Sequence, residues 1–117
     1  MKIVIPGEFP TMNEIIEASK RHWASYSSMK RTYTSLVALY ARKLPKVEKA
    51  DITITWVCKN RRQDPDNITA GTKFLMDGLV EAGVLENDGW KQIGDITHRF
   101  EVDKANPRVE IELSEVS

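Results

Sequence analysis

Hydrophobic and polar residues alternate along several stretches of the chain, a pattern typical of β-strands with one buried face. A short β-branched run at residues 3–5 is closed by a turn at Pro6 and Gly7. Three longer runs follow, with apolar positions at Ile52, Ile54, Trp56 and Cys58, then Ile96, His98, Phe100 and Val102, and finally Val109, Ile111 and Leu113. The pattern therefore predicts four strands, the last two joined by a turn at Asn106-Pro107.

Apolar residues at intervals of three and four predict an amphipathic helix between the first two strands. This helix is expected to begin near Met29, with Ser27 or Ser28 as its cap, and to stop at Pro45. Its apolar face consists of Tyr33, Leu36, Val37, Tyr40, Ala41 and Leu44. A short helix is also expected over residues 13–20.

A second main helix is predicted over residues 66–82, ended by Gly83. The main elements then occur in the order β-α-β-α-β-β. This order favours an α+β fold in which two main helices pack on a mixed, largely antiparallel sheet of about four strands. A length of 117 residues, with no repeat or Ser/Gly linker, predicts a single domain over residues 1–117. The expected core includes Trp56, Cys58, Phe74, Leu75, Leu79, His98 and Phe100.

The composition excludes some classes of protein and of site, but it does not identify a function. The chain has 17 basic and 17 acidic residues, which argues against a DNA-binding protein that acts through a uniformly positive surface. The single cysteine excludes an internal disulfide and a Cys-rich zinc site. No secretory leader or membrane-spanning run is found, so we expect a cytoplasmic location and no membrane partner.

Residues 59–67, which read KNRRQDPDN, carry the most informative chemistry. They lie where a predicted buried strand ends and a helix begins. Pro65 favours an extended conformation at Asp64 and suits the first turn of a helix. Asp64 and Asp66, one residue apart in such a segment, can converge on a common point. Magnesium accepts one or two carboxylates of this kind, together with water and phosphate.

The same residues can also be interpreted as purely structural. Asp-Pro-Asp-Asn is also an ordinary turn and helix cap. Lys73 lies seven residues after Asp66, so on a continuous helix it shares a face with Asp66 and is placed to hold a phosphate. Its alternative is a solvated pair with Asp77, four residues further on.

Residues 61–91 resemble the RusA family of Holliday-junction resolvases. The family pattern is a basic stretch, Asp-x-Asp-Asn, a lysine on the next helix, Asp-x-Leu, a glycine and an acidic turn. In this chain the corresponding positions are Arg61-Arg62, Asp64-Pro-Asp66-Asn67, Lys73, Asp77-Gly-Leu79, Gly83 and Asp88. The chain departs from the pattern in a longer gap before Lys73, and in Asn87, which stands where a second aspartate is usual.

The resemblance implies a RusA-like endonuclease domain that acts as a homodimer, binds four-way DNA junctions and cuts them with Mg²⁺ in recombination and repair. It also implies that Asp64, Asp66 and Asp88 are catalytic metal ligands and that Lys73 assists them, and it suggests a prophage origin. The expected phosphate contacts are made by Lys59, Arg61, Arg62 and Lys73. Tyr26, Lys30 and Arg31 extend this DNA-binding surface or simply form a solvated helix edge.

Two other functions remain open at this point. The chain could be a non-catalytic protein that binds junctions or other nucleic acids, with the acidic residues serving only as caps. It could also be a different metal-dependent phosphoesterase, because a fold and a metal site do not name a substrate. Trp90 is expected to pack against the fold rather than to stack on an unpaired base.

Overall fold

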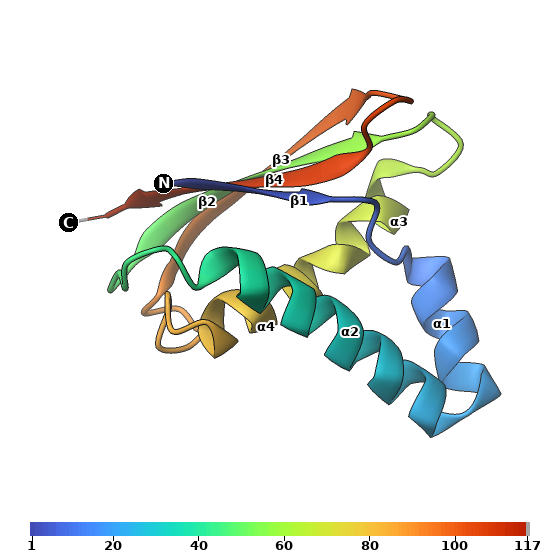
Figure 1. The fold of residues 1–117 in the computed structure, drawn as a ribbon, viewed down its shortest axis with the longest axis horizontal. Coiled ribbons are helices and arrows are strands. Elements are labelled where there is room, and N and C mark those ends of the chain that lie inside the picture. The colour runs from blue at the N-terminus through green and yellow to red at the C-terminus, as the bar shows by residue number, and fades with distance from the viewer. Residues whose placement is uncertain (117) are drawn as a thin grey trace.

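The computed structural model describes residues 1–116 and joins four strands into one mixed sheet, with the main helices on one of its faces (Figure 1). The strands are β1 (Lys2–Pro6), β2 (Ala50–Cys58), β3 (Ile93–Val102) and β4 (Arg108–Glu115). The helices are α1 (Met12–Arg21), α2 (Trp23–Ala41), α3 (Pro65–Ile68) and α4 (Thr72–Glu81), with a 3-10 turn, η1 (Thr69–Gly71), between the last two. The predicted α+β fold with about four strands is confirmed.

The sheet has the strand order β1-β4-β2-β3. Strand β4 pairs antiparallel with both β1 and β2, whereas β2 pairs with β3 in parallel. A parallel pair needs a crossover connection, and here α3, η1 and α4 supply it. The prediction of a largely antiparallel sheet therefore matches only in part. Strand β3, at the edge, runs alongside β2 in the same direction.

The predicted order of elements was too simple. The short helix expected over residues 13–20 is present as α1, and the helix expected over residues 66–82 is interrupted by η1. Residue 71 in this turn has room only for glycine, because a Cβ there would lie 3.1 Å from Phe9 Cβ and from the Trp56 ring. The end of this segment agrees with the prediction, since Gly83 follows α4 with a φ of +80°.

Helix α2 is displaced towards the N-terminus relative to the prediction. It begins at Trp23 rather than near Met29, because His22 provides the cap. The Nδ1 atom of His22 accepts a hydrogen bond from the Ala24 amide at 3.1 Å. The helix ends at Ala41, and the chain then turns with a hydrogen bond from the Leu44 amide to the Ala41 carbonyl, ahead of Pro45.

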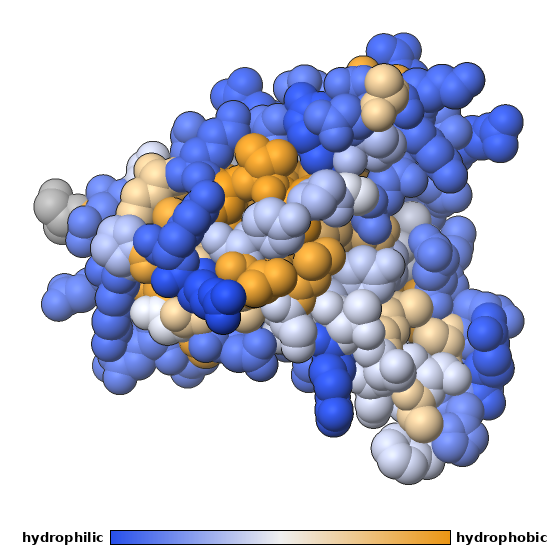
Figure 2. Space-filling view, viewed as in Figure 1, coloured by the Kyte–Doolittle hydropathy of each residue, from blue (hydrophilic) through white to orange (hydrophobic). Residues whose placement is uncertain are grey.

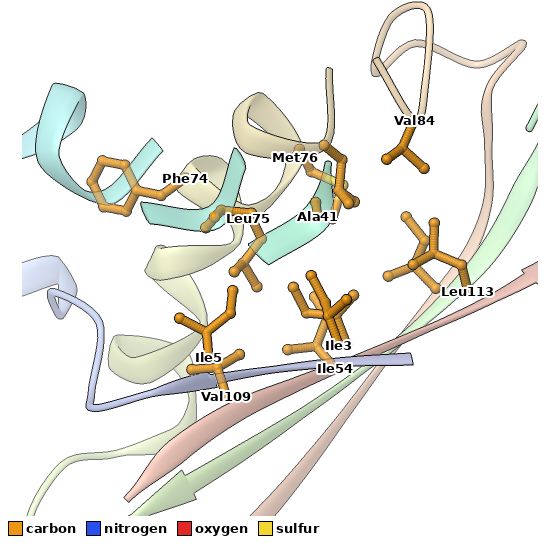
Figure 3. Packing of buried hydrophobic residues seen from close by; sticks show 14 of the residues in the cluster. Ile3, Ile5, Ala41, Ile54, Phe74, Leu75, Met76, Val84, Val109 and Leu113 are labelled. Atoms are coloured by element: carbon orange, nitrogen blue, oxygen red, sulfur yellow. The ribbon is translucent and has the colours of Figure 1, made fainter. Parts of the chain in front are cut away.

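The hydrophobic core lies between the helices and the sheet. Leu75 of α4 points towards Ile5 of β1 and Val109 of β4 in the close view (Figure 3). The predicted core residues Trp56, Phe74, Leu75 and Leu79 are all buried. On the surface, hydrophobic residues gather across the middle of the face drawn in Figure 2, and hydrophilic ones surround them. Among the described residues, no helix has both the length and the hydrophobicity that crossing a membrane requires.

Strand β3 breaks the expected pattern of burial. Phe100 was predicted to be in the core, but it is 42% exposed, and His98 is only partly buried. Phe100 lies opposite Trp56 in the parallel register and so shares the helix-facing side of the sheet. The helices end short of this edge strand, which leaves the side chain without a cover. Cys58, at the end of β2, is likewise only partly buried.

Candidate functional site

The DPDN motif lies at the carboxyl end of β2, as the sequence predicted. Asp64 has an extended backbone with φ −72° and ψ 149°, and Pro65 is the first residue of α3. These are the conformations that an aspartate before proline and a proline in a first helical turn favour. The carbonyl of Asp64 accepts hydrogen bonds from the amides of Asn67 at 3.0 Å and Ile68 at 3.1 Å. The turn is thus fixed by its backbone.

The carboxylates of Asp64 and Asp66 are exposed. Asp64 occupies the N-cap position, yet its side chain makes no capping hydrogen bond. Asp64 therefore occupies the position that the helix-cap interpretation requires, but its side chain does not make the capping hydrogen bond. Two exposed carboxylates, one residue apart and next to an N-terminal helical turn, are oxygen donors of the kind that a hard divalent cation accepts.

Asn67 has a role that the sequence did not reveal. Its Oδ1 accepts a hydrogen bond from the amide of Asn13, in the first turn of α1, at 3.0 Å. Its Nδ2 donates to the side chain of Gln63. Asn67 therefore ties the carboxylate-bearing turn to an element 54 residues away in the sequence. The family resemblance includes Asn67, but no sequence pattern predicted its contact with Asn13.

Basic residues surround the motif on the side where β2 ends. Arg61 and Arg62 are exposed, and the Arg62 amide donates to Asn60 Oδ1 at 3.0 Å. Lys59 is also exposed, but its Nζ lies 3.9 Å from a carboxylate oxygen of Glu8, and its amide donates to Glu8 at 3.1 Å. Of these three cations, the two arginines are thus the better placed to meet a phosphate.

A cleft of about 530 Å³ opens beside these residues. Charged and polar residues from three separate parts of the chain line it, including Glu8, Glu14, Lys59, Arg62, Gln63 and Arg108. Glu8 and Arg108 were not singled out from the sequence, because only the fold brings residues 8 and 108 next to the end of β2. Burial, and secondarily the charge of Glu8, raises the pKa of the Cys58 thiol in this cleft. The raised pKa favours the unreactive thiol form.

Lys73 makes the contact that its structural alternative anticipated. Its Nζ lies 3.6 Å from Asp77 Oδ1, and Lys30 of α2 approaches Asp77 Oδ2 at 4.0 Å. This Oδ2 atom is buried and has no hydrogen-bond partner within residues 1–116. The 3-10 turn η1 also changes the rotation per residue, so the shared helical face expected for Lys73 and Asp66 does not follow.

Asp88 is not brought beside the other two aspartates within one chain. It lies in the exposed turn between α4 and β3, where its amide donates to Asn87 Oδ1 at 2.8 Å. That turn meets the amino end of β2, because the Ala50 amide donates to the carbonyl of Gln92. Asp64 follows the carboxyl end of the same strand, and the two ends are far apart in Figure 1.

The length of β2 sets the scale of this separation. Nine residues at about 3.3 Å each put the two ends of β2 roughly 25–30 Å apart, and the turn with Asp88 lies at one end while the motif follows the other. Accordingly, within residues 1–116 no three Asp, Glu, His or Cys side chains come close enough to hold a metal ion together. Trp90, in the same turn as Asp88, is 96% exposed, so the prediction that it packs against the fold is wrong.

The residues proposed to extend the DNA surface, Tyr26, Lys30 and Arg31, all lie on α2. Tyr26 is partly buried and Arg31 is exposed, while Lys30 approaches Asp77. Comparison with known proteins adds no identification: no family model matches the chain, and no curated protein matches it.

Proposed function

We propose that this protein is a magnesium-dependent endodeoxyribonuclease that cuts branched DNA, with four-way junctions as its main substrate. One observation carries the proposal: Asp64 stands at a helix N-cap without using its carboxylate to cap the helix. A purely structural cap gains its stabilisation from that hydrogen bond. A free carboxylate at this position, with Asp66 next to it and two arginines before it, is better explained by a ligand.

The donor set fits magnesium. Asp64 and Asp66 supply two hard oxygen ligands on an exposed turn, and magnesium usually takes one or two protein carboxylates while keeping several waters. Magnesium bound here would lower the pKa of a water molecule and offset charge on the phosphoryl oxygens. The resemblance of residues 61–91 to the RusA family supports DNA as the substrate. The third ligand that the resemblance implies, Asp88, lies at the other end of β2 within one chain.

The chain's own residues would hold and orient the DNA. Arg61 and Arg62 are exposed on the approach to the two aspartates and can pair with phosphates on either side of the bond to be cut. Such contacts fix the position of the backbone without reading its sequence.

A non-catalytic DNA-binding protein is the second candidate, and one observation favours it. A single chain leaves Asp88 at the far end of β2 from Asp64, as it would if the acidic residues had no common ligand. Against this, a pure binder loses affinity by placing exposed carboxylates beside the phosphate backbone.

The two candidates differ in their response to magnesium. The protein would be incubated with end-labelled four-way junction, linear duplex and single strand, each with Mg²⁺ and with EDTA. We expect paired cuts in the junction alone, and only with Mg²⁺. The variant Asp64→Asn, purified in parallel, controls for contaminating nucleases. Junction binding without any cleavage at saturating Mg²⁺ would favour the non-catalytic candidate.

A further inference from the structure

Helix α2 and its two ends form the most strongly basic segment of the chain. Glu17 and Glu48 lie on either side of this segment, and the sequence has no acidic residue between them. Seven of the 17 basic residues fall here, so the rest of the chain has ten basic and 17 acidic residues. The seven are Lys20, Arg21, Lys30, Arg31, Arg42, Lys43 and Lys46. A net charge of zero is therefore the sum of a basic segment around α2 and an acidic remainder.

Most of these cations are available to an anion from outside the chain. Within residues 1–116, Lys30 is the only one of the seven that forms an ion pair, with Asp77 at 4.0 Å. Lys20, Arg21 and Arg31 are all exposed. A cation without an acidic neighbour can pair with a phosphate and release counterions without first losing a partner. The basic segment is therefore suited to a polyanion.

An exposed aromatic ring lies at the corner where α1 meets α2. Trp23, the first residue of α2, is 75% exposed. One side of its ring stacks on His22, with centroids 5.7 Å apart and planes inclined by 30°. The His22 ring is itself held by its hydrogen bond from the Ala24 amide. The indole is thus supported from one side and open on the other, and an open aromatic ring among cations is the arrangement on which bases of single-stranded nucleic acids stack.

Cations and hydroxyl groups continue from this ring along one side of α2. Trp23, Ser27 and Arg31 follow one another at intervals of four residues, so they lie within about 80° of helix rotation and along about 12 Å of the axis. All three are exposed, and Lys20 and Arg21 end α1 immediately before them. We call these five residues the corner surface, which lies away from the sheet in Figure 1. Lysine, arginine and serine side chains are common hydrogen-bond donors to phosphate oxygens.

The chemistry of the corner surface fits a nucleic acid better than a membrane. Trp23 is its one large apolar side chain, and the residues that follow it on α2 include Ala24, Ser25, Ser27 and Ser28. A helix that lies in a membrane surface buries a whole apolar face in the lipid, which these serines would oppose. Stacking on a base requires only a single exposed ring beside cations.

Helix α1 connects the corner surface to the DPDN motif. The Asn13 amide, in the first turn of α1, donates to Asn67 Oδ1 at 3.0 Å, so this helix begins beside the motif. Arg21, eight residues further on, lies about 12 Å along the helix axis. A stacked strand advances about 3.4 Å per nucleotide, so three to four nucleotides span this distance. A strand with one phosphate at the motif can therefore reach the corner surface.

We propose that the corner surface binds an unpaired DNA strand. Lys20, Arg21 and Arg31 hold its phosphates, and Trp23 stacks on a base about three to four nucleotides from the phosphate at the DPDN motif. The distance to the cut rests on the proposed nuclease function, whereas the binding of a strand does not. Stacking costs least on a base that is already unpaired, so this surface favours DNA with unpaired bases over an intact duplex.

Tryptophan fluorescence tests the stacking without reference to cleavage. Of the three tryptophans Trp56 is buried, so in Trp90→Phe protein the exposed fluorophore is Trp23. In EDTA we expect oligothymidylate to quench this protein, and a blunt duplex of equal length to quench it much less. Trp23→Phe, which keeps the exposed Trp90, is the matched control and should be quenched much less by oligothymidylate. Equal quenching of the two proteins, or equal quenching of Trp90→Phe by duplex, polyglutamate or phosphatidylglycerol vesicles, would overturn the proposal.

Paired substitutions test the phosphate contacts. Lys20→Gln with Arg21→Gln should weaken the binding of labelled oligothymidylate and reduce the slope of log K against log salt concentration by about 1.4, or about 0.7 for each lost contact. Arg42→Gln with Lys43→Gln is the matched control, because these exposed cations follow the other end of α2 and the same charge is lost. Trp23→Ala should weaken binding by about 5- to 150-fold, as the loss of one stacked base implies. Equal slopes in the two double variants would overturn the phosphate contacts.

The outcomes separate this inference from the proposed function. If oligothymidylate quenches Trp23 while wild-type protein cuts no DNA, the corner surface stands and the proposed nuclease function falls. If wild-type protein cuts junctions, and Trp23→Ala and the variant at Lys20 and Arg21 bind and cut them equally well, the nuclease function stands and the inference is wrong.

Discussion

The indole Nε1 of Trp56 donates a hydrogen bond to Nδ1 of His98 at 3.0 Å, and the two rings lie nearly parallel with centroids 6.1 Å apart. The contact joins the largest buried side chain of β2 to the edge strand β3. It also fixes the form of His98: because Nδ1 accepts the hydrogen bond of the indole N–H, it cannot itself carry a proton. The hydrogen bond therefore requires the neutral imidazole.

This relationship predicts that the protein loses stability in mild acid. Burial lowers the pKa of His98 from its usual value of 6.5. The unfolded chain then takes up a proton at a higher pH than the folded one, so the free energy of unfolding falls as the pH drops below about 6.5. In His98→Gln, which can accept the indole hydrogen bond without titrating, the fall should be smaller. Urea unfolding between pH 7.5 and 5 measures both, and equal slopes in the two proteins would contradict the assignment.

A second prediction concerns the contact between α2 and α4. A Cβ on Gly78 would clash with the side chain of Val37 and lie 3.1 Å from the Thr34 carbonyl oxygen. Gly78→Ala would add about 0.8–1.0 kcal/mol of helix propensity. Overpacking of a close helix contact typically costs 1–3 kcal/mol, so we expect a net loss in the free energy of unfolding.

Gly89→Ala is the control for that experiment. The nearest atom to its added Cβ would be Gln92 Oε1 at 3.5 Å, at the end of a flexible side chain. We expect a change within about 0.5 kcal/mol. Equal stability of the Gly78→Ala and wild-type proteins in urea would show that α2 and α4 separate more easily than their packing implies.

The strands could be predicted from the sequence because the alternation of hydrophobic and polar residues is a local property. The same property explains the error at β3. Ile96, His98, Phe100 and Val102 alternate in the way that a covered strand does, and no local pattern tells whether a helix reaches over it. The start of α2 was missed for a related reason, since the serines at residues 27 and 28 resemble a cap, while His22 provides the actual one.

Only the part of the site whose residues are close together in the sequence could be predicted. Asp64 and Asp66 lie at the end of a strand, as the sequence indicated, because strand, proline and helix follow one another directly. The position of Asp88 depends on the parallel pairing of β2 and β3, which puts the turn before β3 at the opposite end of the sheet. Sequence spacing between Asp66 and Asp88 carries no information about that pairing.

A third prediction tests the two aspartates as metal ligands. Asp66→Asn removes one charge from an exposed carboxylate, so the fold should be unaffected, and the junction should bind equally well or slightly more tightly. Cleavage should be abolished, because the loss of this negative charge weakens the binding of the metal ion. Ca²⁺ should support binding without cleavage in the wild-type protein, because its looser geometry suits in-line transfer poorly.

The matched control is Glu17→Gln, which neutralises an exposed acidic residue on α1. Single-turnover cleavage, with protein in excess over labelled junction, separates loss of catalysis from loss of affinity. Full activity of Asp66→Asn at saturating Mg²⁺ would remove this residue from the metal site.

The last prediction concerns Lys73, whose observed contact is with Asp77 rather than with the motif. The side chain is 58% exposed, and the pair joins residues four apart on α4, so its contribution to stability should be only about 0.3–0.5 kcal/mol. Breaking it to reach a phosphate is correspondingly easy. If Lys73 contacts the phosphate that is cut, Lys73→Ala should lower the single-turnover rate by about 10²–10³-fold and affect binding much less, because a transition-state contact contributes more to rate than to ground-state affinity.

Lys30→Ala is the control that the structure offers, since Lys30 approaches the same Asp77 from α2 at 4.0 Å. If the role of Asp77 is only to balance nearby positive charge, the two variants should behave alike, with small changes in stability and none in rate. If Lys73 acts on the phosphate, only Lys73→Ala should lose cleavage. A rate within twofold of wild type for Lys73→Ala would contradict the catalytic role, and would leave Arg61 and Arg62 as the cations that stabilise the reacting phosphate.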